Sequence, residues 1–181
     1  MGDGDEQRML AYREGDAAAF EALYRRHRGP LFRFVLRSVR ERALAEELFQ
    51  EIWMRVIEAR ERYEAQAKFT TWLYTIAHNR LVDHWRKKGL QLASLDQEDP
   101  MDPPAAPSVQ PEKILEGKQS LARFVRALEA LPLAQREAFL LHQEAGMSVP
   151  EIARATGANE EAAKSRLRYA LSKLKEAMGD D

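Results

Sequence analysis

One stretch near the middle of the chain, residues 89–111, limits how the whole chain can fold. It holds five of the eight prolines, together with several acidic residues and few apolar ones. Proline removes a backbone donor, and a segment with so little apolar surface cannot bury enough of it to fold, so we expect a flexible, extended linker. The chain therefore divides into two domains, residues 1–90 and 112–181, joined by an acidic, proline-rich linker at 91–111.

Both domains are predicted to be helical, because apolar residues recur at three- and four-residue steps and no convincing strand pattern is present. In the first domain we expect helices at 5–14, 16–39 with a bend allowed at Gly29-Pro30, 43–60 and 70–88. In the second domain we expect helices at 112–131, 134–144, 148–156 and 159–178. The predicted fold class is all-α, with two small helical domains.

Composition narrows the class of protein. A hydrophobic content of 45% with 31% charged residues is typical of a soluble globular protein. Cysteine is absent, which excludes disulfides and thiolate metal sites in this chain and fits a reducing compartment. The acidic N-terminal residues lack the apolar core of a signal peptide, and no apolar run is long enough to insert into a membrane. We therefore expect a cytoplasmic protein.

The formal net charge of -1 conceals strong local asymmetry. Residues 21–42 carry a net charge of +5, residues 78–88 carry +3, and residues 164–175 contain five basic and no acidic side chains. Residues 95–117 carry a net charge of -5. Basic patches of this kind are the electrostatic signature of nucleic-acid binding, which an overall charge near zero would hide.

The predicted helix at 43–60 has two apolar stripes where a folded domain needs only one. The first stripe is typical of a core-facing helix and comprises Ala45, Leu48, Phe49, Ile52, Val56 and Ala59. The second comprises Glu46, Gln50, Trp53 and Ile57, with Met54 alongside. An exposed aromatic residue bordered by polar ones is typical of a protein interface, so we expect Trp53 to be exposed and its truncation to cost less than about 1 kcal/mol. Alternatively, the helix lies in mid-bundle and both stripes are buried.

The end of the second domain carries a helix-turn-helix pattern. Ser148 and Glu151 form a capping box, Gly157 suits a left-handed turn, and Asn159 can cap the following helix. That helix turns an apolar stripe inward, namely Ala163, Leu167, Ala170, Leu171, Leu174 and Met178, and leaves Glu161, Lys164, Ser165, Arg168 and Ser172 outward. Residues at the start of such a helix can read DNA bases and phosphates. The alternative is a helical hairpin with a solvated basic face.

The predicted helix at 70–88 mixes aromatic and basic residues. One stripe is assigned to the core and comprises Leu73, Ala77, Leu81 and Trp85. A second comprises Trp72, Ile76, Asn79, Asp83 and Arg86, with Arg80 and Lys87 beside it. Stacking, amide and cationic groups on one face are the combination that holds unpaired bases. A core role for Trp72 and Ile76 is the alternative.

These motifs together resemble one protein family. The sequences at 46–53 and 69–86 are similar to regions 2.2 to 2.4 of bacterial RNA polymerase sigma factors of the sigma-70 family. The Leu-Pro-Leu-Ala-Gln-Arg-Glu sequence at 131–137, with Ile152-Ala153 and Lys164-Ser165-Arg166-Leu167, is similar to region 4. Only regions 2 and 4 are present, as in the extracytoplasmic-function (ECF) class. The resemblance covers nearly the whole chain, and the two domains agree in order and spacing.

The resemblance implies transcription initiation without covalent chemistry or cofactors. It implies that the domain at 1–90 binds the clamp helices of the largest polymerase subunit through Glu46, Gln50, Glu51, Trp53, Met54 and Ile57. It further implies recognition and melting of the -10 element through the 61–68 loop and Lys68, Trp72, Asn79, Arg80, Arg86 and Lys87. The domain at 112–181 would contact the polymerase on the -35 side and bind the -35 element through Glu161, Lys164, Ser165, Arg166 and Arg168. An anti-sigma factor is an expected partner, which could hold the protein near the membrane.

Two positions depart from the family pattern. Glu161-Ala162-Ala163 stands where many members have Gly-Thr-Val, which affects how the last helix approaches DNA. Residues 63–68 lack the Asp and Gly common in the loop before Phe69, which leaves the identity of the captured base open.

Two other classes compete with this interpretation. A two-domain regulator whose first domain senses a ligand would bind an operator without polymerase. An enzyme with a metal site at His78, Asp83 and His84 is the third class. Spacings of five and six residues do not align these side chains on one helix face as a spacing of four would, so core or surface roles are favoured for them.

Overall fold

The computed structural model describes residues 2–89 and 117–179, and these residues form helices and turns without strands. The predicted linker lies outside the described residues. The first half contains α1 (Gly2–Arg13), α2 (Ala17–Val39), α3 (Arg42–Ala59), the 3₁₀ turn η1 (Arg60–Arg62) and α4 (Phe69–Lys87). The second half contains α7 (Lys118–Ala130), α8 (Leu133–Ala145), α9 (Val149–Thr156) and α10 (Glu160–Gly179). The all-α prediction is confirmed. The helix ends agree with the predictions within three residues, except that α7 begins at Lys118, after a non-helical Gly117, rather than at 112.

Local capping explains where α2 begins and ends. The Asp16 carboxylate accepts hydrogen bonds from the backbone N–H groups of Ala18 and Ala19, at 3.1 and 3.3 Å. Arg40 follows the last turn in the left-handed conformation, with φ of 70°, and its N–H donates to Leu36 O. Pro30 lies inside this helix, which continues through it.

The first half is a helical bundle whose apolar core is continuous with that of the second half. Its α4 stripe of Leu73, Ala77, Leu81 and Trp85 is buried, as predicted. Leu48, Ile52 and Val56 of α3 are buried against it, and Leu31, Phe34 and Val35 of α2 complete the same core. The three other helices therefore fix the position of α4.

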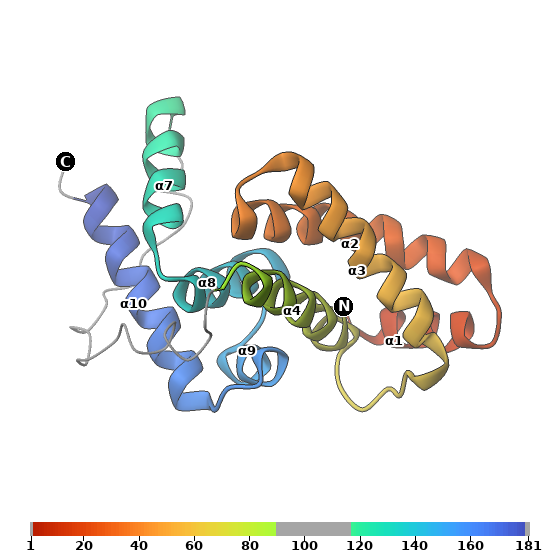
Figure 1. Cartoon of the computed structure of the whole chain (residues 1–181). Coiled ribbons are helices and arrows are strands. Elements are labelled where there is room, and N and C mark those ends of the chain that lie inside the picture. The colour runs from red at the N-terminus through yellow and green to blue at the C-terminus, as the bar shows by residue number, and fades with distance from the viewer. Residues whose placement is uncertain (1, 90–116, 180–181) are drawn as a thin grey trace.

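The second half is built around α10. This helix packs against α7, α8 and α9, and it buries Ala163, Leu167, Ala170 and Leu174. Leu171 and Met178 are only partly buried. Figure 1 shows α7 and α10 side by side at one end of the molecule, while α8 and α9 lie next to the first half. The two halves are in contact, because α8 packs against α2 and α9 packs against α4.

Candidate functional site

The helix-turn-helix is capped as predicted. Ser148 Oγ accepts from the Glu151 N–H, and the Glu151 carboxylate accepts from the Ser148 N–H at 2.8 Å. Gly157 ends α9 with φ of 70°, and Asn159 Oδ1 accepts from the Ala162 N–H at 2.7 Å to begin α10. The turn is therefore defined by local side chains and holds α9 and α10 at a fixed angle.

The outward face of α10 agrees with the prediction at two of its five positions, and Ser172 is among the partly buried ones. Glu161 and Lys164 are exposed, whereas Ser165, Arg166 and Arg168 are partly buried. At the unusual triplet, Ala163 is completely buried, so its side chain belongs to the core of this half. An exposed cation near the helix start, with further cations along the same helix, can contact phosphates and base edges of duplex DNA.

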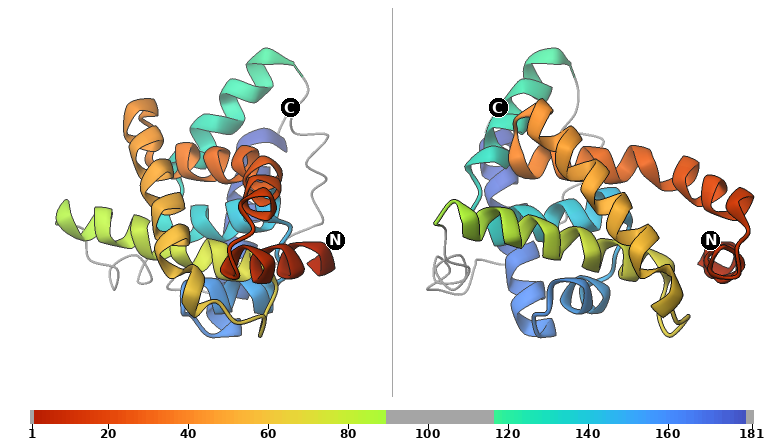
Figure 2. Two further views of the ribbon diagram at one scale, coloured as in Figure 1. Left: turned by 90° about the vertical axis from the view of Figure 1, so that its right-hand side faces the viewer. Right: turned by 45° about the vertical axis from the view of Figure 1, so that its right-hand side comes forward.

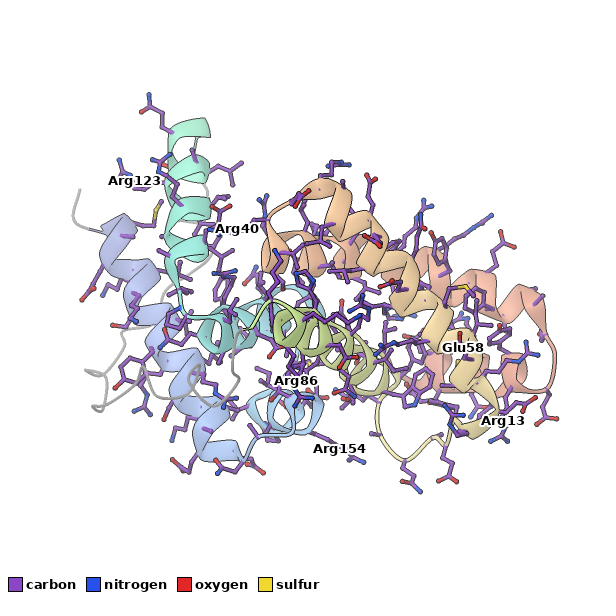
Figure 3. All side chains as sticks on the ribbon, viewed as in Figure 1. Arg13, Arg40, Glu58, Arg86, Arg123 and Arg154 are labelled. Atoms are coloured by element: carbon purple, nitrogen blue, oxygen red, sulfur yellow. The ribbon has the colours of Figure 1, made fainter. Side chains whose placement is uncertain are left out.

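The predicted nucleic-acid face of α4 is divided between exposed and packed side chains. Asn79, Arg86 and Lys87 are exposed, and Figure 3 labels Arg86 on α4. The Trp72 ring is partly buried, with its centroid 5.0 Å from that of Tyr63 and 5.9 Å from that of Phe69. Trp72 is therefore anchored in an aromatic cluster with one part left accessible, and its contact with a base stays a prediction.

Arg80 departs from our prediction of a DNA contact. Its side chain is only 13% exposed, and its Nε donates to Glu51 Oε2 at 2.6 Å. Glu51, predicted to contact polymerase, is thus engaged in the same ion pair. Arg55 and Asp83 form a second pair between α3 and α4, at 3.0 Å. These pairs border a surface cavity of about 450 Å³ that also includes Met54, Arg86 and Lys87, so predicted polymerase and DNA residues adjoin at one hollow.

The expectation that Trp53 is exposed is wrong. Its side chain is 5% exposed and lies against the rings of Phe20, Tyr24 and Phe49. The mid-bundle alternative is correct at this position, because α2 covers that side of α3 with aromatic residues. Of the other members of the second stripe, Glu46, Gln50 and Met54 are exposed and Ile57 is half-buried. Met54, at 54%, is one of the exposed large apolar side chains in the described part of the chain.

The histidine and aspartate residues of the alternative metal site do not converge. His78 Nδ1 lies 2.6 Å from Glu137 Oε2, whereas Asp83 contacts Arg55. Burial, followed by the nearby cations Lys88 and Arg80, lowers the pKa of His84 and so favours its neutral form. Within residues 2–89 and 117–179, no three His, Asp or Glu side chains gather as a metal site requires.

Comparison with known proteins assigns the family. Residues 23–91 match the family described as Sigma-70 region 2, and residues 121–174 match Sigma-70, region 4. The chain is 36% identical to the RNA polymerase sigma factor CarQ of Myxococcus xanthus over 174 residues, which cover 95% of this chain and 96% of CarQ. The chain belongs to the sigma-70 family.

Further relatives assign this sigma factor to the ECF class. It is 31% identical to the ECF RNA polymerase sigma factor RpoE of Cereibacter sphaeroides over 166 residues, covering 90% of this chain and 88% of the relative. A solved structure of the sigma factor RpoE with the anti-sigma factor NepR, from Bartonella quintana, has a TM-score of 0.69 at 25% identity and covers 90% of this chain and 98% of that one. The structure of CnrH with the cytosolic domain of CnrY shares the fold, with a TM-score of 0.72 at 22% identity and 99% coverage of both chains.

Sequence reasoning missed the residues that join region 2 to region 4 in this sigma factor. Arg136 is 7% exposed and donates to the carbonyls of Leu128, Glu129 and Leu131 in its own half and of Ser38 at the end of α2. Four acidic side chains of the second half also pair with basic ones of the first. One signal was available, since Glu137 and Glu144 are seven residues apart and therefore lie on one face of α8.

No helix in the described part of the chain is both long and apolar enough to cross a lipid bilayer.

Proposed function

We propose that this ECF sigma factor binds core RNA polymerase and directs it to promoters by reading the -35 element with α10 and the -10 element with α4. The observation that carries the proposal is the presence, in one chain, of a capped helix-turn-helix with an exposed Lys164 and of a second basic helix with an exposed Asn79. The matches to region 2 and region 4 support the assignment of the first surface to the -10 element and of the second to the -35 element.

At the -35 element, α10 acts on duplex DNA. Lys164 supplies charge for phosphates, while Arg168 and Ser165 offer donors to phosphates or base edges. Glu161 lies in the first turn, where a carboxylate can accept from the cytosine amino group. Arg166 lies on the side of α10 that faces α4, so its contact with DNA requires the two halves to move apart.

At the -10 element, α4 acts on unpaired DNA. The exposed Asn79 amide can hydrogen-bond to the edge of an unstacked base, and the accessible part of Trp72 can stack on a base. Lys68, Arg86 and Lys87 supply positive charge at the two ends of the helix. Capturing an extruded base favours the melted state, which is how a protein without catalytic chemistry assists promoter opening.

Polymerase binding is assigned to the exposed part of α3. Gln50, Met54 and Glu46 are available to a partner, with Ile57 at the edge of the patch. Trp53 supports this patch from beneath and Glu51 borders it through its pair with Arg80. Region 4 makes the second polymerase contact, on the -35 side.

The function needs no enzyme activity and no cofactor, and it places the protein in the cytoplasm with the polymerase. An anti-sigma factor is the proposed regulator, which could hold the chain near the membrane. The support is the similarity to a sigma factor whose structure was solved with its anti-sigma factor NepR.

Run-off transcription with purified bacterial core polymerase tests the function. The promoter is one recovered by in vitro selection with the reconstituted holoenzyme. Arg168→Ala is expected to weaken closed-complex formation on duplex DNA and to be largely rescued on a template that is already melted and lacks a -35 element. Asn79→Ala should form closed complexes but open them slowly, without full rescue on the melted template.

The matched control is Arg25→Ala, because Arg25 is exposed on α2 and, among the residues that the structure describes, its ion pair is with Glu21 of the same helix. Permanganate reactivity and promoter retention are read on both templates. Indistinguishable defects in the two variants would reject the separation of roles. Sequence-specific gel shifts without core polymerase, and no transcription with it, would indicate a ligand-sensing regulator instead.

A further inference from the structure

The N-terminal helix α1 holds the 61–68 loop near both of its ends. Near the start of the loop, Arg13 Nη1 donates a hydrogen bond to Tyr63 O at 2.8 Å. Directly after the loop, the Phe69 N–H donates to Glu6 Oε2 at 2.5 Å. Glu6 and Arg13 lie on the same helix, seven residues apart, which is about 10 Å along its axis. One helix therefore sets the distance between the two ends of the loop.

Helix α1 can act as a support because it is itself fixed to the first half. Its inward face consists of Asp5, Met9 and Tyr12, all of which are buried. The Asp5 carboxylate lies 2.9 Å from His27 Nε2 and 3.3 Å from Arg26 Nη1, both on α2. Displacing α1 would separate this buried carboxylate from its partners, which is strongly unfavourable. The loop is therefore attached to a helix that cannot shift easily.

The loop residue that Arg13 holds also supports the proposed stacking residue. Tyr63 is completely buried, and its ring stands edge-on to that of Trp72, with the centroids 5.0 Å apart. Just before it in the chain, the Arg60 guanidinium lies 5.1 Å from the ring centroid of Tyr12 on α1, in a cation–π contact. Figure 3 labels Arg13 near this end of the loop. A shift of the Tyr63 backbone would therefore move the ring against which Trp72 packs.

The centre of the loop differs from its ends. Glu64, Ala65 and Gln66 are exposed. Gln66 Nε2 donates to Glu64 Oε2 at 2.7 Å, and the Gln66 N–H donates to Glu64 O at 2.8 Å, so these two contacts stay within the loop. Exposed carboxylate and amide groups can hydrogen-bond to base edges, but they do so selectively only when they are held in a defined place. Ends that are already fixed also reduce the cost of ordering the loop when a base binds.

The contacts of Arg13 favour an action on the loop over direct contact with DNA. Its Nη1 is directed at the Tyr63 carbonyl, and its Nε lies 3.4 Å from the carboxylate of Glu14, a pair in which the acid is 76% exposed. A shorter, well-directed hydrogen bond from a charged donor is stronger than a long, exposed ion pair. The main partner of Arg13 is therefore the backbone of the loop.

We propose that Arg13 is a positioning residue for the capture of an unpaired -10 base. Through the Tyr63 carbonyl it fixes the 61–68 loop, and with it the Trp72 ring, in the arrangement that receives the base. The proposal rests on the proposed function, since it concerns the same base-capture surface. Arg13 acts through the loop and does not itself touch the DNA.

The test uses the full chain in the reconstituted holoenzyme. The holoenzyme is offered two single-stranded oligonucleotides of equal length, one with the -10 sequence of the selected promoter and one with the same bases in scrambled order. The ratio of the two affinities isolates base recognition, because losing a phosphate contact weakens both alike. Arg13→Ala should lower this ratio about three- to tenfold, in line with the loss of one intramolecular hydrogen bond. Permanganate should show slower opening of the duplex promoter, with closed complexes retained.

Three further variants separate the hydrogen bond from charge and from folding. Arg28→Ala is the matched control, because it removes the same charge from an exposed position of α2, and it should leave the ratio unchanged. Arg13→Lys keeps a donor and should retain most of the ratio. Arg13→Met keeps an unbranched apolar stem without a donor and should behave like Arg13→Ala. Thermal unfolding of each free protein checks that the fold is intact.

A ratio in Arg13→Met equal to that of the wild-type protein or of Arg28→Ala would overturn the proposal. Loss of folding in Arg13→Met would also overturn it, since Arg13 would then be a residue of the fold alone. Asn79→Ala in the same assay separates the two levels of inference. If Asn79→Ala lowers the ratio and Arg13→Met does not, base capture stands and only the positioning role is lost. A wild-type holoenzyme without any preference for the -10 strand would reject the proposed function itself.

Discussion

The interior of the first half and the contact between the halves use the same helix, α4, in two different ways. Towards α3 and α2 it buries apolar side chains such as Leu73 and Leu81, and nearby aromatic rings pack around Trp53 and Phe69. Towards α8 and α9 it presents His78 to Glu137, with Lys68 and Glu151 at its start. Apolar burial resists salt and is lost only on unfolding, whereas charge pairs can be exchanged for other ions. The first contact buries mainly apolar side chains, whereas the second adds charged pairs to the apolar packing that makes one continuous core of the two halves.

The largest expected effect is the loss of an aromatic side chain from the first contact. Trp53→Ala should lower the free energy of unfolding by about 3 to 5 kcal/mol, because it leaves a cavity among Phe20, Tyr24 and Phe49. Urea unfolding at equilibrium measures the change. Met54→Ala, one residue away and exposed, should cost about 0.5 kcal/mol or less. Equal costs for the two variants would contradict the packed role of Trp53.

Arg136 takes part in contacts within the second half and in the contact between the halves. Its substitution should have the second-largest effect on stability. Arg136→Ala leaves four buried or half-buried carbonyls short of a donor, which should cost about 2 to 3 kcal/mol. Thermal unfolding measures this change. Arg136→Lys keeps the charge but not the fork of donors, so an intermediate loss is expected. Full stability in Arg136→Lys would show that charge alone matters here.

Salt should distinguish the two contacts directly. The proline-rich composition of residues 89–111 predicts the first proteolytic cut there. The nicked halves should stay associated in about 0.05 M salt and bind each other roughly tenfold more weakly in about 0.5 M salt. Size-exclusion chromatography follows the association, and circular dichroism should show unchanged helicity in both fragments. Fragments that unfold on separation would mean that neither half is stable without the other.

The smallest expected effect is a pH dependence of folding stability that arises from a histidine in the first half. His27 is buried beside the Asp5 carboxylate, 2.9 Å away, and burial outweighs that contact and lowers the pKa of His27 below 6.5. The folded state therefore binds fewer protons than the unfolded state, and stability falls as the pH drops below 6.5. His27→Gln should remove this part of the slope between about pH 6.5 and 5. An identical slope in both proteins would assign the loss to other groups.

Local patterns in the sequence were sufficient to predict the positions of most of the helices. Asp16, Ser148 and Asn159 marked helix starts because a cap and the N–H group that it accepts are close in sequence. The family motifs added the order of the two domains. Trp53 could not be placed, because its burial depends on Phe20 and Tyr24, which are about thirty residues earlier in the chain.

The site residues were predicted unevenly for a similar reason. Exposure of Asn79 and Lys164 follows from helix periodicity, which the sequence displays. The pair of Arg80 with Glu51, and that of Lys68 with Glu151, depend on how helices cross. Charged residues lie on many solvated faces, so a pattern of charges does not reveal which of them meet another helix.

One hydrogen bond from the N-terminal helix α1 stabilises the start of α4, directly after the 61–68 loop that is predicted to contact DNA. The first N–H group of α4, that of Phe69, donates to the Glu6 carboxylate at 2.5 Å, because Lys68 before it supplies no side-chain cap. The start of α4 is thus capped from a helix about sixty residues away, and residues 23–91 of the region 2 match do not include that helix. A region 2 fragment trimmed to the family boundary would begin α4 without its cap. Studies of promoter melting with isolated region 2 should therefore retain α1.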